Sequence, residues 1–265
     1  MFAEAGWALY ALSGFVVGLL VGMTGVGGGS LMTPILIVLF GFHPTVAVGT
    51  DLLFATVTKS VGATVHRAKG TIDWRIVLRL ASGSVPASIA ALLVLAWLGA
   101  PSAETARVIT LVLGCALLVT AVAVLFRNKI ADWAHSRDAI LSDRGAAIGT
   151  VLLGLVLGAA VTFSSVGAGA IGVTALVLLY PKIPTARIVG TDIAHAVPLT
   201  LVSGVGHWLL GSVDVGLLAM LLIGSIPGVI LGSLMLARTD DRWIRVVLAI
   251  VLLIVTTRLL WPMFS

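Results

Sequence analysis

Long apolar stretches dominate the chain, and short polar segments separate them. The apolar residues run continuously instead of alternating with polar ones, so the pattern predicts helices and not the strands of a membrane barrel. We expect an all-α membrane protein with ten helical segments. Their expected bounds are 6–24, 31–42, 44–65, 74–99, 106–126, 146–165, 170–180, 184–206, 213–236 and 243–263.

The second and seventh segments are too short to cross a bilayer. About 12 residues of helix reach about 18 Å, whereas the hydrocarbon core is about 30 Å thick. We therefore expect each short segment to form a re-entrant hairpin with the segment before it. The Gly-rich tip of each hairpin would then stop inside the membrane.

The second half of the chain repeats residues of the first half. Gly49-Thr50-Asp51 recurs as Gly190-Thr191-Asp192, and the spacing is 141 positions. Collinear matches of this kind indicate a duplication. We expect two transmembrane repeats, residues 1–126 and 146–265, joined by a cytoplasmic linker at 127–145. Further matches are Gly83-Ser84-Val85-Pro86 with Gly224-Ser225-Ile226-Pro227, Gly14 with Gly154, Gly18 with Gly158, and Thr24, Gly27 and Gly29 with Ser164, Gly167 and Gly169.

Basic residues gather in alternate loops. Thirteen of the 16 Lys and Arg residues flank the loops near 66–75, 127–144, 182–187 and 238–245. The positive-inside rule makes this face cytoplasmic. Each half has an odd number of segments, so the two halves are expected to be inverted, with both termini outside.

The composition agrees with a membrane protein. Only 10% of residues are charged and 59% are hydrophobic, whereas a soluble domain carries roughly 25% charged residues. The net charge of +5 is explained by the cytoplasmic loops, so we expect no nucleic-acid partner. Cys115 lies in an apolar run and is expected to be a small buried side chain.

The two Gly-rich tips are the strongest candidates for a binding site. Glycine lets backbone N–H groups approach a ligand closely, and the short helix that follows points its positive N-terminal end at the tip. Two tips meeting at mid-membrane would form an anion site. The alternative is that the glycines only permit tight turns and helix packing. The expected substrate-binding residues are Thr24, Gly25, Gly27, Gly28, Gly29 and Ser30 in the first tip, Ser164, Ser165, Gly167 and Gly169 in the second, and Thr50, Lys59 and Thr191 nearby. By contrast, Gly14-x-x-x-Gly18-x-x-x-Gly22 and Gly224-x-x-x-Gly228-x-x-x-Gly232 are expected to pack helices.

Asp51 and Asp192 lie about two turns inside the third segment of each half. A central aspartate costs about 2.5–3.5 kcal/mol on insertion scales, so both are functional candidates. Each could carry a proton that couples transport, or could organise the site by accepting N–H bonds from the facing hairpin. Both roles stay open at this point.

Several other polar residues fall inside or beside the apolar segments. Lys59 follows Asp51 by two helical turns and could attract an anion, pair with a carboxylate or extend to the membrane surface. His195 shares a helix face with Asp192 and could relay a proton or be a hydrogen-bonded core residue. Other expected placements are Asp73 and Asp214 as helix N-caps, His66 and His207 at the membrane interface, and Ser84 and Ser225 facing the cavity.

No catalytic or metal-binding motif is present. His-Glu-x-x-His, Gly-x-Ser-x-Gly and Cys/His clusters are all missing from the sequence. We therefore expect no enzyme activity, no metal and no cofactor.

With these motifs in hand, the chain resembles the TauE/SafE family of sulfite exporters. The resemblance rests on the two-half layout, on the run from Gly22 to Gly29 followed by Pro34, and on Gly49-Thr50-Asp51 with its repeat. It implies a bacterial inner-membrane transporter of sulfur-containing anions such as sulfite, sulfonates or sulfoacetate. The second tip departs from the Gly-rich pattern, with Ser164-Ser165 and Ala168 in place of glycines.

The sequence thus favours a secondary carrier that works by alternating access and is driven by protons. Its partners would be a small anion, protons and the lipid bilayer, and a homo-oligomer is compatible with the pattern. The alternative is an anion channel in which the same hairpins form a fixed filter.

Overall fold

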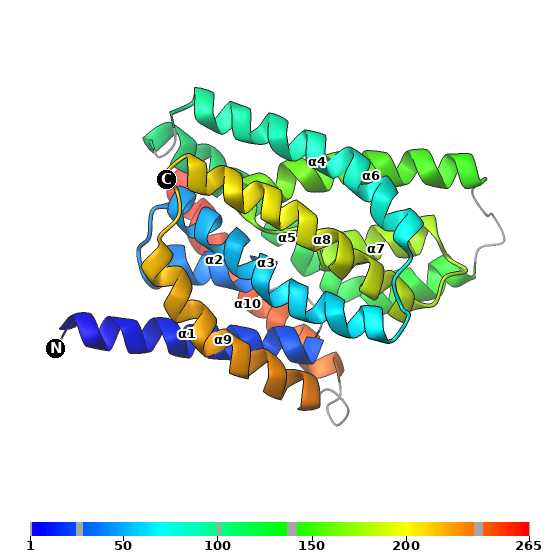
Figure 1. The fold of residues 1–265 in the computed structure, drawn as a ribbon, viewed down its shortest axis with the longest axis horizontal. Coiled ribbons are helices and arrows are strands. Elements are labelled where there is room, and N and C mark those ends of the chain that lie inside the picture. The colour runs from blue at the N-terminus through cyan, green and yellow to red at the C-terminus, as the bar shows by residue number, and fades with distance from the viewer. Residues whose placement is uncertain (1, 25–28, 100–101, 137–141, 236–240, 265) are drawn as a thin grey trace.

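The computed structural model describes residues 2–24, 29–99, 102–136, 142–235 and 241–264. These residues are helical apart from short connections, as the sequence predicts (Figure 1). The helices are α1 (Phe2–Thr24), α2 (Gly29–Val38), α3 (Pro44–Ala68), α4 (Trp74–Trp97), α5 (Ala103–His135), α6 (Asp143–Ser164), α7 (Ala170–Leu179), α8 (Thr185–Leu209), α9 (Val215–Met235) and α10 (Asp241–Phe264).

All ten predicted segments are confirmed as helices within a few residues, with one larger difference. Helix α5 continues to His135, so the first part of the expected linker at 127–145 is helical. The prediction of two short segments also holds. Helices α2 and α7 have 10 residues each, which corresponds to about 15 Å, or about half of the hydrocarbon core.

Five of the described helices are long and apolar enough to cross a membrane, namely α4, α5, α6, α8 and α9. Helix α3 has 25 residues, a sufficient length, but it carries Asp51 and Lys59 in its interior. Both of these side chains are buried. Since polar groups are costly when they face lipid, α3 is tolerated in a membrane because other helices cover these two side chains.

Glycines bring two pairs of helices into backbone contact. On α1, a Cβ at Gly14 or Gly18 would overlap the backbone of α9, and a Cβ at Gly224 would overlap the carbonyl oxygen of Ala11 on α1. Helices α4 and α6 pack in the same way, because Gly83 contacts Val151. The expectation that the glycine stripes pack helices is confirmed. The other glycines of these two contacts are Gly154, Gly158, Gly228 and Gly232.

Helices α3 and α8 run antiparallel through the middle of the molecule (Figure 1). Near their midpoints, the Thr56 hydroxyl donates to the Thr200 hydroxyl at 3.0 Å. At opposite ends of the pair, Gly49 contacts the backbone of Ser212, and Gly190 contacts the backbone of Thr71. Each glycine thus lets a loop from the other half of the chain approach a central helix.

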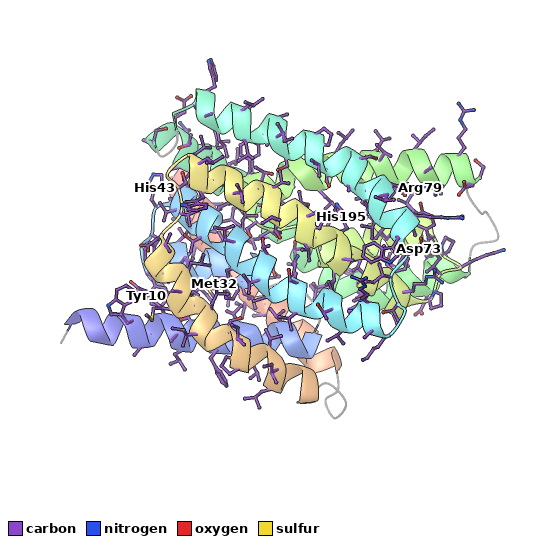
Figure 2. The ribbon with its side chains drawn as sticks, in the orientation of Figure 1. Tyr10, Met32, His43, Asp73, Arg79 and His195 are labelled. Atoms are coloured by element: carbon purple, nitrogen blue, oxygen red, sulfur yellow. The ribbon has the colours of Figure 1, made fainter. Side chains whose placement is uncertain are left out.

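The first turn of α1 and the last turn of α10 lie at the same end of the molecule (Figure 1). His43 lies at that end, whereas Asp73 and Arg79 lie at the opposite end (Figure 2). At that opposite end, Arg79 pairs with Asp143 at 3.1 Å and Arg187 pairs with Asp73 at 3.3 Å.

Two sequence expectations about single side chains can be checked directly. Asp73 accepts hydrogen bonds from the backbone of Arg75 and Ile76, and Asp214 accepts one from Leu217, so both are N-caps as predicted. The expectation for Cys115 is wrong. Its side chain is exposed on the outer surface of α5, where an apolar run faces the surroundings and not the core.

Candidate functional site

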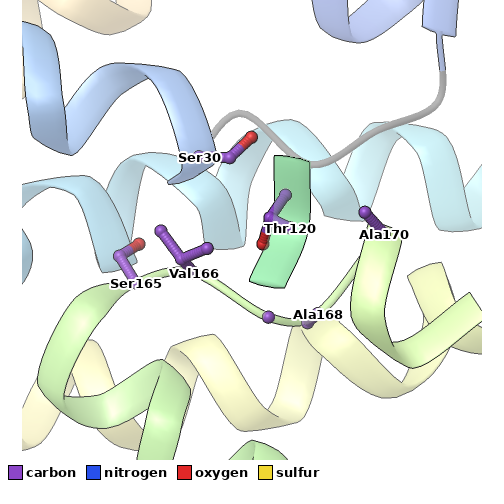
Figure 3. Close-up of a pocket in the computed structure, with 7 residues that line it drawn as sticks. Ser30, Thr120, Ser165, Val166, Ala168 and Ala170 are labelled. Carbon is purple, nitrogen blue, oxygen red and sulfur yellow. The ribbon is translucent and has the colours of Figure 1, made fainter. Parts of the chain in front are cut away.

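The two short helices begin beside the same small cavity (Figure 3). Ser30 of α2 and Ala170 of α7 lie on its wall, and Thr120 of α5 lies between them. The segment from Ser165 to Ala168 completes the lining. The volume is about 10 Å³, which is room for about one water molecule.

The second tip has a backbone that depends on glycine. After α6 ends at Ser164, Gly167 and Gly169 adopt φ values of 131° and 132°, a region that other residues rarely occupy. Ser165 has a φ of 59° and is the one non-glycine residue with positive φ in the described part of the chain. Strained backbone of this kind often occurs at ligand sites.

The two serines of this tip face different ways. The Ser164 hydroxyl accepts a hydrogen bond from the Val166 N–H at 3.1 Å and donates to the Ala160 carbonyl, so it stabilises the turn. The Ser165 hydroxyl is buried, lines the cavity and has no hydrogen-bond partner among the described residues. Ser165 is therefore the better placed of the two to bind a ligand.

Most of the first tip lies outside the described residues. This applies to Gly25, Gly27 and Gly28, whereas Thr24 and Gly29 are described only as the end of α1 and the start of α2. Ser30 is the described member of the predicted set, and its buried side chain lines the cavity.

Asp51 is held by the short helix of its own half. The Thr33 hydroxyl of α2 donates to Asp51 Oδ2 at 2.5 Å, and both side chains are fully buried. Asp51 Oδ1 has no hydrogen-bond partner within the described ranges, and the Ser165 hydroxyl lies close to this carboxyl group. Asp51 therefore connects α3 to the first turns of α2.

Asp192 lies against the other short helix, α7. A Cβ at Gly172 would overlap Asp192 Oδ1, so only glycine allows this approach. The backbone N–H of Gly169 faces the carboxyl group. Neither carboxyl oxygen has a hydrogen bond of ordinary geometry to another described residue, which leaves Asp192 less satisfied than Asp51.

Lys59 of α3 lies beside the second tip and near both aspartates. Its ammonium group donates to the Ala168 carbonyl of the second tip at 2.9 Å, and 7% of the residue is exposed. Its charge acts on both Asp192 and Asp51, but it forms no ion pair with a described carboxylate. The alternative that Lys59 extends to the membrane surface is therefore wrong, because the second tip binds it in the interior.

His195 occupies the middle of the molecule (Figure 2). Its Nε2 lies 2.8 Å from the Ser84 hydroxyl of α4, and both side chains are fully buried. Ser84 is thus buried, but it was expected to face the cavity and it does not line it. His207, which was expected at the membrane interface, does not face the outside of the protein. It is fully buried because the end of α8 is covered by α3 and α6, and its Nε2 contacts the Thr162 carbonyl oxygen at 3.0 Å.

Thr50 and Thr191 do not line the cavity. Instead, the Thr50 hydroxyl accepts the Asp214 N–H at 3.0 Å, and the Thr191 hydroxyl accepts the Asp73 N–H at 2.9 Å. In each Gly-Thr-Asp motif the glycine allows close contact with a loop from the other half of the chain, and the threonine hydroxyl accepts a hydrogen bond from that loop. Each motif therefore joins the two halves of the chain.

Thr33 and Thr120 are site residues that the sequence analysis missed. Thr120 is buried in α5 and its hydroxyl has no partner in the part of the chain that the structure describes. A lone threonine in a long apolar run was the available signal in each case. Threonine is common in membrane helices, where its hydroxyl can bond to its own backbone, so the signal is weak.

The positive groups of the site converge on the cavity. Two helix N-termini, the Lys59 ammonium group and three hydroxyls are all able to donate hydrogen bonds to an anion. The described residues hold no cluster of His, Cys, Asp and Glu side chains that could bind a metal ion. The convergent donors are suited to binding a small anion.

Known proteins match almost the whole chain. The family described as sulfite exporter TauE/SafE matches residues 10–259. The probable membrane transporter protein YjnA of Bacillus subtilis (strain 168) is 37% identical over 244 residues, which cover 92% of this chain and 95% of that protein. A probable membrane transporter protein of Xylella fastidiosa (strain 9a5c) is 26% identical, over 85% of this chain and 83% of its own length.

No solved structure shows a significant match. The relatives are described as transporters and not as enzymes, and they are of similar length to this chain. The chain is a multi-pass membrane protein that belongs to the sulfite exporter TauE/SafE family of transporters.

Proposed function

We propose that this transporter is a secondary carrier that moves a small sulfur-containing anion across the bacterial cytoplasmic membrane by alternating access, coupled to protons. The substrate class is sulfite, a sulfonate or sulfoacetate. The observation that carries the proposal is the small polar cavity between the N-termini of α2 and α7, with Lys59 beside it. A sulfonate or sulfite group presents three oxygens, and Ser30, Thr120 and Ser165 offer hydroxyls from three separate elements.

The size of the cavity favours a carrier over an open channel. Room for about one water molecule is too little for a sulfonate group, so the residues that line the cavity have to move apart before the substrate enters. Lys59 holds the second tip closed through Ala168. A bound anion would compete for the same ammonium group and would therefore loosen that contact.

The charges of the site suggest how protons are coupled. One lysine lies near two aspartates, and an unbalanced charge is costly in a low-dielectric interior. When an anion binds, protonation of one aspartate restores the balance, so anion and proton move in the same direction. We assign the proton to Asp192, which accepts no hydrogen bond from a described side chain, and the site-organising role to Asp51, which binds Thr33.

The two halves of the chain would form inverted repeats, at 1–126 and 146–265, with the linker in the cytoplasm. Matching contacts support this idea, since α1 packs on α9 as α6 packs on α4, and α3 pairs antiparallel with α8. The short helices α2 and α7 would be re-entrant. With the basic loops inside, both termini would lie outside the cell.

Purified protein in liposomes tests this proposal. A carrier exchanges labelled substrate for unlabelled substrate across the membrane, so we expect counterflow with at least one of sulfite, thiosulfate and short sulfonates, and little with carboxylates of equal size. Large ionic currents without counterflow would instead support an anion channel. Exchange of carboxylates alone would refute the substrate class.

A further inference from the structure

An open groove lies where the last turns of α3 meet the start of α4 and the middle of α8. Its volume is about 310 Å³, which is at the lower end of the range for small-molecule sites. The cavity beside the two short helices is far smaller, at about 10 Å³, and shares no lining residue with the groove. The groove is therefore a separate feature of the surface.

One wall of the groove is polar. Ser60, Thr64 and Arg67 line it, and they share one face of α3 because they are spaced by three or four residues. Arg67 is exposed and forms no ion pair with a described carboxylate. The two hydroxyls donate to carbonyl oxygens of their own helix, but a hydroxyl can rotate to donate to a ligand instead. This wall thus offers one positive charge and two hydroxyls.

The opposite wall of the groove is apolar, and it includes Val197 and Pro198 of α8. Beside the groove, the side chains of Val61 and Leu78 are exposed, so this surface faces lipid in a membrane protein. Trp74 also lines the groove and is 53% exposed, and tryptophan is enriched where a membrane meets water.

The groove runs from the end of α3 toward its middle. Helix α3 ends at Ala68, directly after Arg67, whereas Ser60 lies about 10 Å deeper along the helix. The positive charge is therefore at the interfacial end of the groove, and the deeper end lies among apolar side chains.

The other half of the chain lacks the polar wall. The matching positions, 141 residues later, hold Leu201, Val205 and Trp208. All three are exposed, so apolar side chains are compatible with the matching surface of α8. Hydroxyls and an arginine are more costly than apolar side chains on a helix that faces lipid. Helix packing alone therefore does not account for the polar wall on α3.

We infer that the groove binds an anionic phospholipid. Its phosphate would contact Arg67 and Thr64, its glycerol ester would contact Ser60, and one acyl chain would lie along Val197 and Pro198. Basic pockets between membrane helices bind such headgroups, and a guanidinium group can donate two parallel hydrogen bonds to a phosphate. A small free anion would match only the polar wall, whereas the two walls together match an amphiphile. The inference does not rest on the proposed substrate or on proton coupling.

Native mass spectrometry of the detergent-purified protein tests this inference. Phosphatidylglycerol and phosphatidylcholine with identical acyl chains are titrated separately, and the lipid-bound fraction gives a Kd for each. We expect phosphatidylglycerol to bind about tenfold more tightly. Arg67→Gln should weaken its binding about tenfold, since a charge-assisted hydrogen bond is lost, and should thereby remove the preference between the two lipids.

Two further variants separate the groove from the surface charge around it. Lys69→Gln removes the same charge from an exposed residue that does not line the groove, so the Kd should change by less than about twofold. Ala63→Phe keeps every charge but fills the groove, and it should weaken the binding of both lipids. Thermal unfolding shows whether each variant is folded.

Equal effects of Arg67→Gln and Lys69→Gln on the Kd would overturn the inference, because lipid would then be attracted by the basic surface in general. Binding that neither Arg67→Gln nor Ala63→Phe weakens would place the lipid elsewhere and overturn it as well. Displacement of phosphatidylglycerol by millimolar methanesulfonate or inorganic phosphate would show that the groove binds a free anion and not a lipid.

Discussion

Replacing Lys59 by methionine tests the electrostatics of the site. Methionine has a similar length but no charge and no N–H, so the Ala168 carbonyl loses its partner and the cavity loses its nearest cation. Lys59 reaches a residue of the cavity wall, so we take a separation of about 6 Å between the ammonium group and a bound anion as an order-of-magnitude value for the Coulomb energy. At an effective dielectric constant of about 20 the attraction is about 2.8 kcal/mol, which corresponds to about 100-fold in affinity.

We therefore expect Lys59→Met to raise the Kd for the transported anion about 100-fold. The loss of the bond to Ala168 adds a destabilisation of about 1–3 kcal/mol, the usual cost of leaving a buried acceptor unpaired. Binding to detergent-purified protein can be measured by calorimetry, and thermal unfolding shows whether the variant is folded. Lys69→Met makes the same chemical change at an exposed position and should alter the Kd by less than about twofold. A folded Lys59→Met variant that binds the anion as tightly as the unmodified protein would refute the proposed role of this residue.

Three further predictions concern the aspartates, the helix packing and the topology. Asp192→Asn should abolish accumulation driven by a pH gradient while substrate exchange remains. Asp51→Asn should lower folded yield and substrate binding together, because Thr33 loses a charged acceptor. Uptake by both variants at the normal level would contradict the assignment. Gly224→Leu forces a side chain into the backbone of α1 and should destabilise the protein by about 3 kcal/mol or more, while Gly6→Leu, where a Cβ meets open space, should have little effect on the unfolding temperature. Cysteines at Gly70 and Gly211, in a Cys115→Ala background, should react with a membrane-impermeant reagent from opposite sides of the membrane; reaction from one side alone would rule out inverted halves.

The sequence predicted the helices well because the lipid environment requires long apolar segments and the polar breaks are short. All ten segments were found, and the short helices α2 and α7 were recognised from their length. The glycine stripes were also interpreted correctly, since residues four positions apart lie on one helix face and glycine permits backbone contact there.

The contents of the site were harder to predict. The tips and the two aspartates could be proposed from the sequence because closely spaced glycines and single charges stand out in apolar runs. In contrast, the role of Thr50 and Thr191 depends on loops about 120 to 160 residues away in sequence, and such contacts leave no local pattern. For the same reason the sequence could not show that Lys59 bonds to Ala168 or that Thr120 lines the cavity.

The most direct test of the central claim is uptake of a labelled sulfonate into liposomes under a pH gradient at zero membrane potential. Sulfonates stay ionised across the pH range of the assay, so they do not cross the lipid as neutral acids. With the outside acidic, the account predicts that the sulfonate accumulates inside above its external concentration, and that a proton ionophore abolishes the accumulation. Equilibration of the sulfonate without accumulation, unaffected by the ionophore, would contradict a proton-coupled carrier.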